Sequence, residues 1–428
     1  MTSAIENPLD QAARDVLLGN DRGGYTIPTA RLYPYQWNWD SMFSAWGYGT
    51  FDMVRAWQEV DLLFASQWDT GMVPHIIFHN PDPDYFPGPG VWGATHTPPT
   101  SGISQPPVAA TLILKLYEMD PESGMPHLKT LYPKLVAWHD WWIRERCKDG
   151  PVAIIHPWES GRDNCPDWDI GMEGVQINED DPYTRRDTGH VNADERPLKW
   201  DYDRYLAILA FGRSVNWDDR AMYEDGPFLM ADPGISFVLL RAFMDLIEIG
   251  RILGEDTADL SAQQGQLRDG ISKLWNAEKG WFDAYHLRTG DYANVLGSGA
   301  FLAYFAGVSR PALDAHFARI WDKVSFGVPS ADPESERFDP RRYWRGPTWP
   351  VVNSLIAMGL TDMGRNEAET RLRNETAALI EAGGFWEYYD PLDGTPCGGA
   401  SFGWTAAIWL TWCGKGRTAA QTAGKETE

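Results

Sequence analysis

Hydrophobic residues recur mainly at intervals of three and four, the spacing of an amphipathic helix. This periodicity predicts helices over residues 41–49, 52–67, 104–119, 126–148, 199–214, 232–254, 257–277, 296–306, 310–323, 347–360, 363–382 and 402–413. Several are apolar over a broad face, as in residues 235–249, and such helices pack pairwise in two layers. We therefore expect an all-α fold, and an α/α toroid accommodates this number of helices in one domain.

Long stretches rich in Pro, Gly and Trp separate these helices, at residues 68–103, 150–198, 278–295, 324–346 and 383–401. Loops of this length in a compact domain are usually functional or disordered, and their aromatic content argues against disorder. We expect the chemistry to lie in them, with a short hairpin over 282–292. The chain is predicted to be one catalytic domain over 1–428, with 150–198 as a lid-like insertion and 415–428 as a disordered tail.

Tryptophan is the compositional outlier, with 22 residues among 428. Most of them suit a large core, but those in Trp37-Asn-Trp39-Asp40 and in Trp158-Glu-Ser-Gly-Arg-Asp163 have polar neighbours. Flat rings beside carboxylates match a pyranose, whose C–H faces stack on aromatic rings while its hydroxyls bind acids. The pattern favours carbohydrate chemistry.

The formal charge of −23 disfavours nucleic acids and anionic membranes as partners. The four cysteines form no Cys-x-x-Cys pair, and the nine histidines have no metal-ligand spacing. The N-terminus lacks the pattern of a signal peptide, and no segment approaches the roughly 20 apolar residues of a membrane span. We expect a cytoplasmic protein without metal, cofactor, nucleic acid or membrane partner, and leave a homo-oligomer open.

Two familiar motifs occur in the wrong context. Gly88-Pro-Gly-Val-Trp-Gly93 matches a dinucleotide fingerprint but follows no strand and lies in no βαβ pattern. Gly399-Ala-Ser401-Phe-Gly403 matches a nucleophile elbow, yet the last histidine, His316, precedes it. Neither a dinucleotide site nor a serine hydrolase is predicted.

Glycoside hydrolysis needs one carboxylic acid and one carboxylate. Asp163 lies between Trp158 and Trp168, where loss of hydration would favour its neutral form, as a general acid requires. Glu387 lies in Phe-Trp-Glu-Tyr-Tyr, and a strand with one exposed face would present its side chain on that face. The structural alternatives are a turn or helix-cap aspartate and an ordinary edge-strand glutamate.

At these residues the chain resembles the inverting α-glycosidases of glycoside hydrolase family 63 and, more distantly, the trehalases of family 37. The matching blocks, in family order, are Tyr35-Gln-Trp-Asn-Trp-Asp-Ser41, Gly71-Met-Val-Pro-His75, Ser104-Gln-Pro-Pro107, the segment 158–169, Tyr343-Trp-Arg-Gly-Pro-Thr-Trp349, Glu387-Tyr-Tyr-Asp-Pro391 and Phe402-Gly-Trp-Thr-Ala-Ala407. The short bacterial members look closest, a group that includes hydrolases of glucosylglycerate and mannosylglycerate.

The resemblance implies an (α/α)6 barrel with a few short strands at the rim, Asp163 as general acid and Glu387 as the general base that activates water. It also implies a glycone subsite formed by Trp39, Asp40 and Trp158 and closed by Tyr343, Trp344, Gly346 and Trp349, with Gly161 as a further substrate-binding residue. Tyr33, Trp37, Tyr85, Gln105 and Arg196 would lie nearer the aglycone or share both subsites, with Arg204 as a competitor for the role of Arg196.

The acid loop departs from the usual family pattern Asp-Asn-Ser-Pro-Arg-Trp-Asp, because Cys165 replaces Ser and Asp167 replaces Arg. Arg162 directly precedes the acid, and a guanidinium beside Asp163 would lower the pKa of its carboxyl. We therefore expect Arg162 to face away. The small residues 397–401 lack a Gln that many relatives have there, which weakens any transfer of aglycone specificity.

Arginines cluster in the predicted rim loops, at Arg185, Arg186, Arg196, Arg204, Arg341, Arg342 and Arg345. Two interpretations of this cluster are open. The guanidinium groups could bind the carboxylate of an anionic aglycone such as glycerate, or they could form ion pairs with neighbours such as Asp187, Asp201 and Glu195.

The predicted function is therefore an inverting α-glycosidase acting on a short α-glucoside or α-mannoside such as glucosylglycerate or mannosylglycerate. An α-glucosidase for a neutral disaccharide of the kojibiose or trehalose type is the alternative enzyme. A sugar epimerase or isomerase would need a histidine pair, which His75, His79, His156 and His190 do not obviously supply. A non-catalytic carbohydrate-binding protein would need no pair of protected acids.

Overall fold

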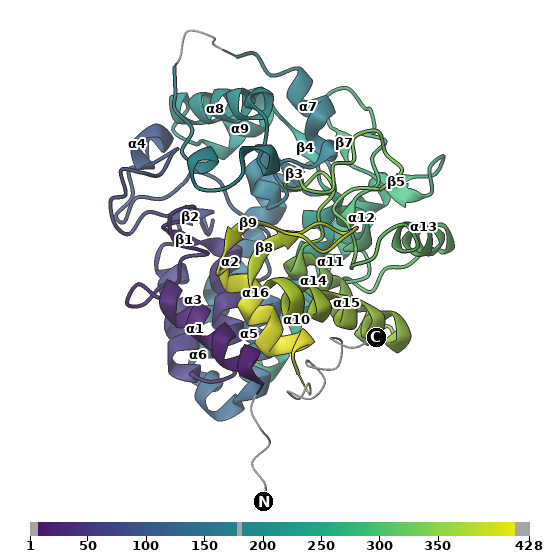
Figure 1. The fold of residues 1–428 in the computed structure, drawn as a ribbon. Coiled ribbons are helices and arrows are strands. Elements are labelled where there is room, and N and C mark those ends of the chain that lie inside the picture. Colours follow the sequence, from purple (N-terminus) through teal and green to yellow (C-terminus); the bar gives the residue numbers. More distant parts are fainter. Residues whose placement is uncertain (1–6, 178–181, 416–428) are drawn as a thin grey trace, which may run out of the picture.

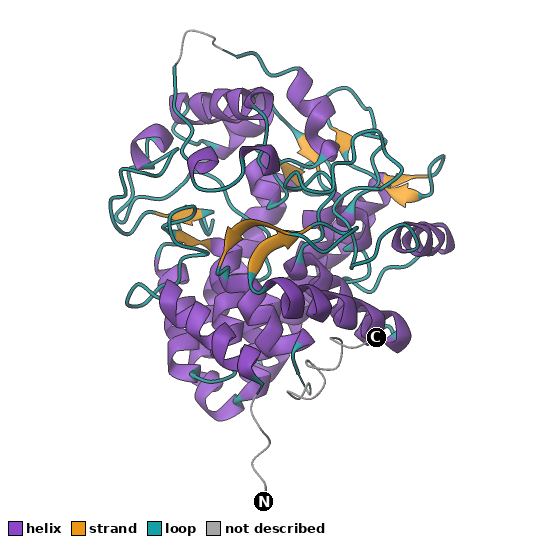
Figure 2. Cartoon of the chain, viewed as in Figure 1, coloured by secondary structure: helices purple, strands orange, loops and turns teal. Residues whose placement is uncertain are grey.

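A computed structural model describes residues 7–177 and 182–415. Residues 416–428 of the predicted tail lie outside this part. The described chain is mostly helical with a few short strands, as predicted (Figure 2). Among the described residues, no helix combines the length and the apolar character needed to cross a membrane.

Six inner helical segments follow one another around the molecule: α2 (Asn38–Tyr48), α5 (Ala109–Met119), α10 (Pro233–Leu253), α12 (Ser298–Phe301), α14 (Pro350–Asp362) and α16 (Gly403–Ile408). α2 contacts α5, α5 contacts α10, α10 contacts α12, α14 contacts α16, and α16 returns to α2. Gly359 of α14 packs against the backbone of Tyr304, just after α12, where a Cβ atom would not fit. Every residue of α2 is buried, as expected for an inner helix.

A second layer of helices covers the first (Figure 1). It consists of α1 (Pro8–Asn20) on α16, α3 (Met53–Ala65) on α2, α6 (Pro121–Trp141) on α5, α11 (Ala258–Ile271) on α10, α15 (Asn366–Gly383) on α14, and α13 (Pro311–Trp321), whose Phe317 contacts Phe301 of α12. In α15 only Leu372, Thr376, Ala377, Leu379 and Ile380 are buried, which is the one-sided burial of an outer helix.

The remaining helical elements are α4 (Pro89–Trp92), α7 (Asp169–Glu173), α8 (Lys199–Ser214) and α9 (Asp219–Asp225), 3-10 turns at Pro157–Ser160, Pro166–Trp168, Asp187–Gly189, Ala193–Glu195 and Ser272–Leu274, and π-helical turns at Trp142–Arg146 and Trp409–Cys413. α8 has the predicted bounds. α1 was not predicted, because only Ala13, Leu17 and Asn20 of its 13 residues are buried. The helix expected over 296–306 is confined to Ser298–Phe301 and continues as turns.

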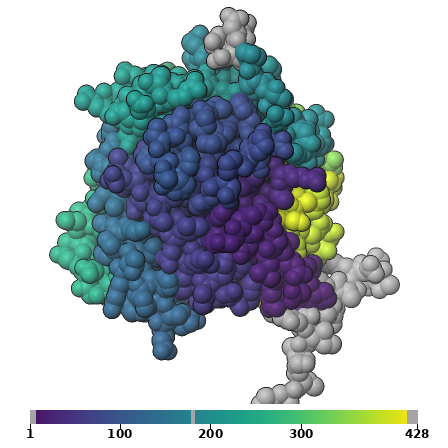
Figure 3. All heavy atoms as spheres, turned by 90° about the vertical axis from the view of Figure 1, so that its left-hand side faces the viewer, coloured from purple at the N-terminus to yellow at the C-terminus, as the bar shows by residue number. Residues whose placement is uncertain are grey.

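Four small antiparallel sheets lie with the long loops at the end where the inner helices begin (Figure 1). They pair β1 (Gln36–Trp37) with β2 (Ile76–Ile77), β4 (Met230–Ala231) with both β3 (Ala153–Ile154) and β7 (Tyr285–His286), β5 (Trp275–Asn276) with β6 (Trp281–Phe282), and β8 (Trp386–Tyr389) with β9 (Pro396–Ala400). The hairpin predicted over 282–292 is confirmed over most of its length: Tyr285 and Tyr292 form an antiparallel bridge, flanked by backbone hydrogen bonds from His286 N–H to the Asp291 carbonyl (2.8 Å) and from Ala293 N–H to the Ala284 carbonyl (2.9 Å). Its first residue, Phe282, belongs instead to β6, which pairs with β5. Figure 3 shows the loop region around residues 70–100, in blue, covering one side of this end.

Candidate active site

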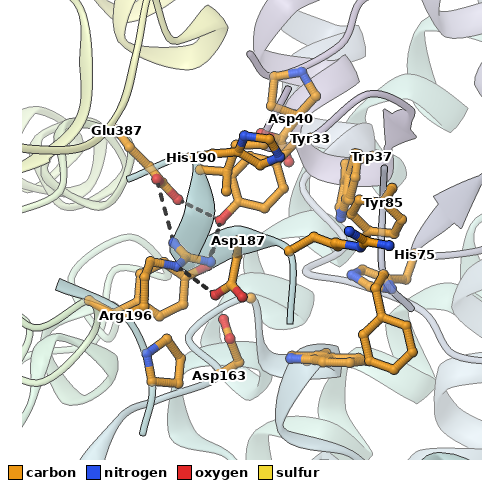
Figure 4. Close-up of a pocket in the computed structure, with 18 of the residues that line it drawn as sticks. Tyr33, Trp37, Asp40, His75, Tyr85, Asp163, Asp187, His190, Arg196 and Glu387 are labelled. Atoms are coloured by element: carbon orange, nitrogen blue, oxygen red, sulfur yellow. Dashed lines mark hydrogen bonds and ion pairs between the residues drawn. The ribbon is translucent and has the colours of Figure 1, made fainter. Parts of the chain in front are cut away.

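A pocket lies among these loops, with an empty volume of about 870 Å³ including its open mouth. All predicted site residues except Gly346 and Trp349 line it, namely Tyr33, Trp37, Trp39, Asp40, Tyr85, Gln105, Trp158, Gly161, Asp163, Arg196, Tyr343, Trp344 and Glu387. Figure 4 labels seven of these, Tyr33, Trp37, Asp40, Tyr85, Asp163, Arg196 and Glu387. Segments from both halves of the chain thus converge on one pocket.

Gly346 and Trp349 lie behind the pocket wall. The indole of Trp349 stacks on that of Trp344 with ring centroids 3.6 Å apart, and its N–H donates to the carbonyl of Tyr343 (3.2 Å). Gly346 packs against the backbone of Asp339, where a Cβ atom would clash. Trp349 therefore supports Tyr343 and Trp344 from behind, and neither Trp349 nor Gly346 is part of the pocket lining.

Asp163 presents its carboxyl group to the pocket from the turn after Pro157–Ser160. The Tyr205 hydroxyl donates to its backbone carbonyl (2.7 Å), and the N–H of Cys165 closes the turn on the carbonyl of Arg162 (3.0 Å). Burial raises the pKa of Asp163 to about 7, although the positive charge of Arg196 opposes this shift. The residue is a turn aspartate, as the structural alternative held, and also has the electrostatics of a proton donor.

Arg162 faces away from the pocket, as expected. Its guanidinium forms an ion pair with Asp232 (2.8 Å) and lies over the ring of Trp168. Asp167 of the same loop is 3.9 Å away. These two acids offset the charge of Arg162, and Arg196 is the cation that acts most on the pKa of Asp163.

Glu387 extends from β8 and is held at both carboxylate oxygens. The Tyr33 hydroxyl donates to Oε1 (2.9 Å), the N–H of Gly399 donates to Oε2 (3.0 Å), and Nη1 of Arg196 lies 3.7 Å from Oε2. Burial raises the pKa of Glu387 above its usual value, although Arg196 and these donors oppose the shift. The contacts stabilise the ionised form that a general base needs.

Asp40 is a third pocket carboxyl, in the first turn of α2. Burial and the charge of Glu387 raise its pKa well above the usual range. Beside it, the N–H of Trp39 donates to the Gln105 side chain (3.3 Å), and the Trp39 indole contacts Trp344 and Trp404. This corner offers both aromatic faces and polar oxygens to a sugar ring.

Arg196 is the buried cation of the pocket. Its Nε donates to Asp187 (3.2 Å) and its Nη2 donates to the Tyr33 hydroxyl (3.0 Å), whereas Nη1 is buried without a hydrogen bond. The guanidinium lies over the Tyr343 ring, 4.2 Å from its centroid. Among the described residues, Nη1 thus has only the longer ion pair with Glu387 (3.7 Å) and can take a hydrogen-bond acceptor.

Of the clustered rim arginines, Arg186 and Arg196 line the pocket. The others are engaged elsewhere: Arg185 with Asp187, Arg341 with Asp390, Arg342 with Asp339, Arg345 with Asp169, and Arg204 with the ring of Trp200. Pairing with neighbouring acids or rings thus accounts for these five members of the cluster, and Arg196 rather than Arg204 reaches the pocket.

Several lining residues were not predicted, including Arg31, His75, Asp187, His190, Tyr202, Phe402 and Trp404. His75, Phe402 and Trp404 lie within the recognised sequence blocks, so a signal for them was present. Arg31, Asp187 and His190 lie in irregular segments without a motif, and only the folded chain brings them to the pocket.

The surroundings of His156 do not support a role for this residue as an acid–base catalyst. Burial lowers its pKa to about 3. Its Nδ1 accepts the N–H of Trp158 (3.0 Å) and its Nε2 bonds to the Tyr205 carbonyl (3.1 Å), so both ring nitrogens are used structurally. In the described part of the chain, no group of three or more His, Cys, Asp or Glu side chains could hold a metal ion.

Comparison with known proteins gives consistent matches over nearly the whole chain. A mannosylglycerate hydrolase of Thermus thermophilus is 44% identical, over 94% of this chain and 99% of its own length. A glucosylglycerate hydrolase of Mycolicibacterium hassiacum is 32% identical, over 95% of this chain and 98% of its own length. The crystal structure of a family 63 mannosylglycerate hydrolase from T. thermophilus with Tris and D-glycerate has a TM-score of 0.91 at 44% identity, covering 94% and 99% of the two chains.

The fold is also that of neutral trehalase from Saccharomyces cerevisiae, with a TM-score of 0.58 at 17% identity, over 90% of this chain and 72% of that one. Residues 33–405 match the mannosylglycerate hydrolase MGH1-like glycoside hydrolase domain. The chain therefore belongs to glycoside hydrolase family 63, in the group of mannosylglycerate and glucosylglycerate hydrolases.

Proposed function

We propose that the protein hydrolyses an α-mannoside or α-glucoside of glycerate with inversion at the anomeric carbon, Asp163 acting as general acid and Glu387 as general base. The observation that carries this proposal is the contrast between two buried carboxyl groups of one pocket. The pKa of Asp163 is raised to about 7, whereas Glu387 is bound by a hydroxyl, a backbone N–H and a nearby arginine. Burial raises the pKa of both groups, but only Glu387 has donors on both carboxylate oxygens, and such a difference in surroundings favours an acid role for one group and a base role for the other.

In the proposed reaction, the neutral carboxyl of Asp163 protonates the glycosidic oxygen as the bond to the anomeric carbon breaks. A water molecule attacks that carbon from the opposite face and transfers a proton to Glu387. Glycerate leaves as the alcohol, and the sugar is released with inverted configuration. Exchange of one proton with solvent restores both carboxyl groups.

The proposed glycerate carboxylate binds at Arg196. Asp187 and Tyr33 take up two of its nitrogens, and the buried Nη1 has no hydrogen-bond partner. A substrate carboxylate would supply this missing acceptor through a charge-assisted hydrogen bond. A D-glycerate complex is known for the relative from T. thermophilus, which supports an anionic aglycone here.

We further propose that the chain forms a single catalytic domain with an (α/α)6 barrel. The circuit of contacts through α2, α5, α10, α12, α14 and α16, and the covering helix on each, support this architecture. The β3 strand of segment 150–198 pairs with β4, so its first part supports the pocket from within the fold. A lid role would fall to residues 182–198.

Arg196→Gln is expected to raise the KM for the glycerate glycoside by roughly 10- to 100-fold, because a charge-assisted hydrogen bond to the substrate is lost. The same variant should raise the KM for the corresponding glycerol glycoside much less. Steady-state kinetics with both substrates distinguishes this loss from an indirect effect of the substitution on Glu387, because Glu387 would take part in the hydrolysis of both substrates.

Arg204→Gln is the matched control, since Arg204 contacts Trp200 outside the pocket. It should leave the ratio of the two KM values unchanged. Equal effects of Arg196→Gln on the charged and the neutral substrate would contradict carboxylate binding at Arg196.

A proton NMR time course with mannosylglycerate, glucosylglycerate, kojibiose and trehalose tests the reaction itself. We expect the β-anomer of the sugar to appear first, from one or both glycerate glycosides. The α-anomer as first product would exclude the inverting mechanism. Cleavage of kojibiose or trehalose alone would move the assignment to a neutral disaccharide, and an isomerised sugar without cleavage would move it to an epimerase or isomerase.

A further inference from the structure

Glu195 directly precedes Arg196 in the chain, and the proposed acid, base and arginine leave it without a role. It is half-buried and forms no ion pair within the described part of the chain. Its Oε1 accepts a side-chain N–H of Asn192 (3.4 Å), and its Oε2 accepts the backbone N–H of Gly398 in β9 (2.9 Å). The second hydrogen bond joins residues 203 positions apart and so ties the loop of Arg196 to the β8–β9 hairpin.

The hairpin that Glu195 contacts is irregular at the proposed base. β8 and β9 form the antiparallel pair drawn in yellow in Figure 1, and their register shifts by one residue between Trp386 and Tyr388. Glu387 therefore faces two residues of β9, Gly398 and Gly399, which is the arrangement of a β-bulge. Bulges disrupt the regular ladder and redirect side chains, often next to active sites.

The two consecutive N–H groups of the bulge donate to two different carboxylates. The N–H of Gly399 donates to Oε2 of Glu387 (3.0 Å), and the N–H of Gly398 donates to Oε2 of Glu195 (2.9 Å). Hydrogen bonds to ionised acceptors are stronger than those between neutral groups. Since the two N–H groups belong to neighbouring residues, a movement of the bulge at Glu195 would also move the donor that holds Glu387.

Gly398 brings the bulge backbone against the base. Its φ is 73°, a conformation that favours glycine. A Cβ atom at this position would lie 2.5 Å from Oε2 of Glu387 and 2.6 Å from the ring of Tyr388. The carboxylate of Glu387 thus lies directly beside the bulge, and no side chain between them could absorb a displacement.

A second hydrogen bond holds Glu195 on the same hairpin. The Tyr388 hydroxyl donates to the backbone carbonyl of Glu195 (2.8 Å). Tyr388 directly follows Glu387, and its ring is fully buried and stacks on Trp349 with centroids 4.4 Å apart. Glu195 therefore contacts β8 through its main chain and β9 through its side chain, on both strands beside the proposed base.

Arg196 has supports of its own and does not depend on the Glu195 carboxylate. Its Nε donates to Asp187 (3.2 Å), its Nη2 donates to the Tyr33 hydroxyl (3.0 Å), and its guanidinium lies over the Tyr343 ring. Removal of the Glu195 carboxylate would therefore release the bulge and leave the arginine in place.

We propose that Glu195 is a positioning residue for the proposed base. Its carboxylate holds the bulge at Gly398, and the neighbouring N–H of Gly399 in turn holds Glu387 in the position from which it activates water. This inference rests on the proposed role of Glu387. Glu195 is not part of the pocket lining, so its contribution falls on turnover rather than on substrate affinity.

Glu195→Ala is expected to lower kcat for the glycerate glycoside by about 10- to 100-fold with little change in KM, because a small misplacement of a catalytic group lowers the rate steeply. Glu195→Gln keeps an oxygen that can accept the Gly398 N–H, and it should retain most of the kcat. Asp194→Ala is the matched control. It removes the adjacent negative charge from an exposed side chain and should leave both kcat and KM unchanged.

Hydrogen–deuterium exchange of the full chain, read by mass spectrometry in peptides that cover residues 396–401, measures the contact without turnover. Exchange in this segment should be faster in Glu195→Ala than in the unmodified protein, and close to normal in Glu195→Gln. An unchanged kcat in Glu195→Ala, or an equal loss of kcat in the Ala and Gln variants, would overturn the proposal. So would a rise in KM that accounts for the whole loss of kcat/KM.

Failure of the proposed function would give a different result. The unmodified protein would then cleave no glycerate glycoside, while the protection of residues 396–401 from exchange would still depend on Glu195.

Discussion

Asp163→Asn is expected to lower kcat for a glycerate glycoside by about 10²- to 10⁴-fold, because the departing oxygen loses its proton donor. An α-glycosyl fluoride of the same sugar should lose far less activity, since fluoride leaves without protonation. The unmodified enzyme should lose kcat/KM as the pH rises through about 7, where Asp163 ionises. That alkaline limb should be absent when the variant acts on the fluoride.

Asp167→Asn is the matched control for this prediction. Asp167 lies in the same loop, is also buried with its pKa raised to about 6, and lies near Arg162 rather than in the pocket lining. It should keep the alkaline limb and the ordinary dependence on the leaving group. An equal loss on both substrates in Asp163→Asn would argue against a proton donor at this position.

Glu387→Ala is expected to reduce hydrolysis by about 10²- to 10⁴-fold as well, since water is no longer deprotonated as it attacks. Azide is already anionic and needs no base, so it should restore turnover and yield the β-glycosyl azide. The fold should persist, which thermal unfolding can verify, although the Tyr33 hydroxyl and the Gly399 N–H lose their shared acceptor.

The two variants should differ in their rescue. Azide should not restore activity of Asp163→Asn on the glycerate glycoside, where the leaving group still lacks a proton. Rescue of Asp163→Asn and not of Glu387→Ala would reverse the two roles, and retained hydrolysis in Glu387→Ala would remove this residue from the mechanism.

The pocket could be predicted from the sequence to the extent that its residues lie in compact motifs. Asp163 and Trp158 are five residues apart, and Glu387 lies in an aromatic strand, so local context indicated burial beside polar groups. The expected direction of Arg162 followed from its unfavourable effect on a neighbouring acid, and its ion pair with Asp232 agrees with that argument. The effect of one side chain on the pKa of an adjacent residue could be predicted because the two residues are neighbours in the sequence.

Features that depend on contacts between distant segments could not be predicted from the local sequence. Asp187 gains its significance from Arg196, which bonds Tyr33 across 163 positions of sequence. The weakly apolar α1 is a helix because Asn7 caps it and α16 covers its narrow buried face. His75 lies within a recognised sequence block, but only the folded chain shows that its Nδ1 is buried without a hydrogen-bond partner among the described residues. In each case tertiary contacts, not local pattern, decide the outcome.

The hydrogen bond from Tyr33 to Glu387 joins residues 354 positions apart and so ties the first part of the chain to the last. Such a contact of very long sequence separation forms late, because much of the intervening chain must be ordered before the two ends meet. The acid turn at Asp163, by contrast, is complete within a few residues. During synthesis, the turn that carries the proposed proton donor can thus form long before the proposed base, Glu387, emerges, and enzymatic activity would be a sensitive reporter of complete folding.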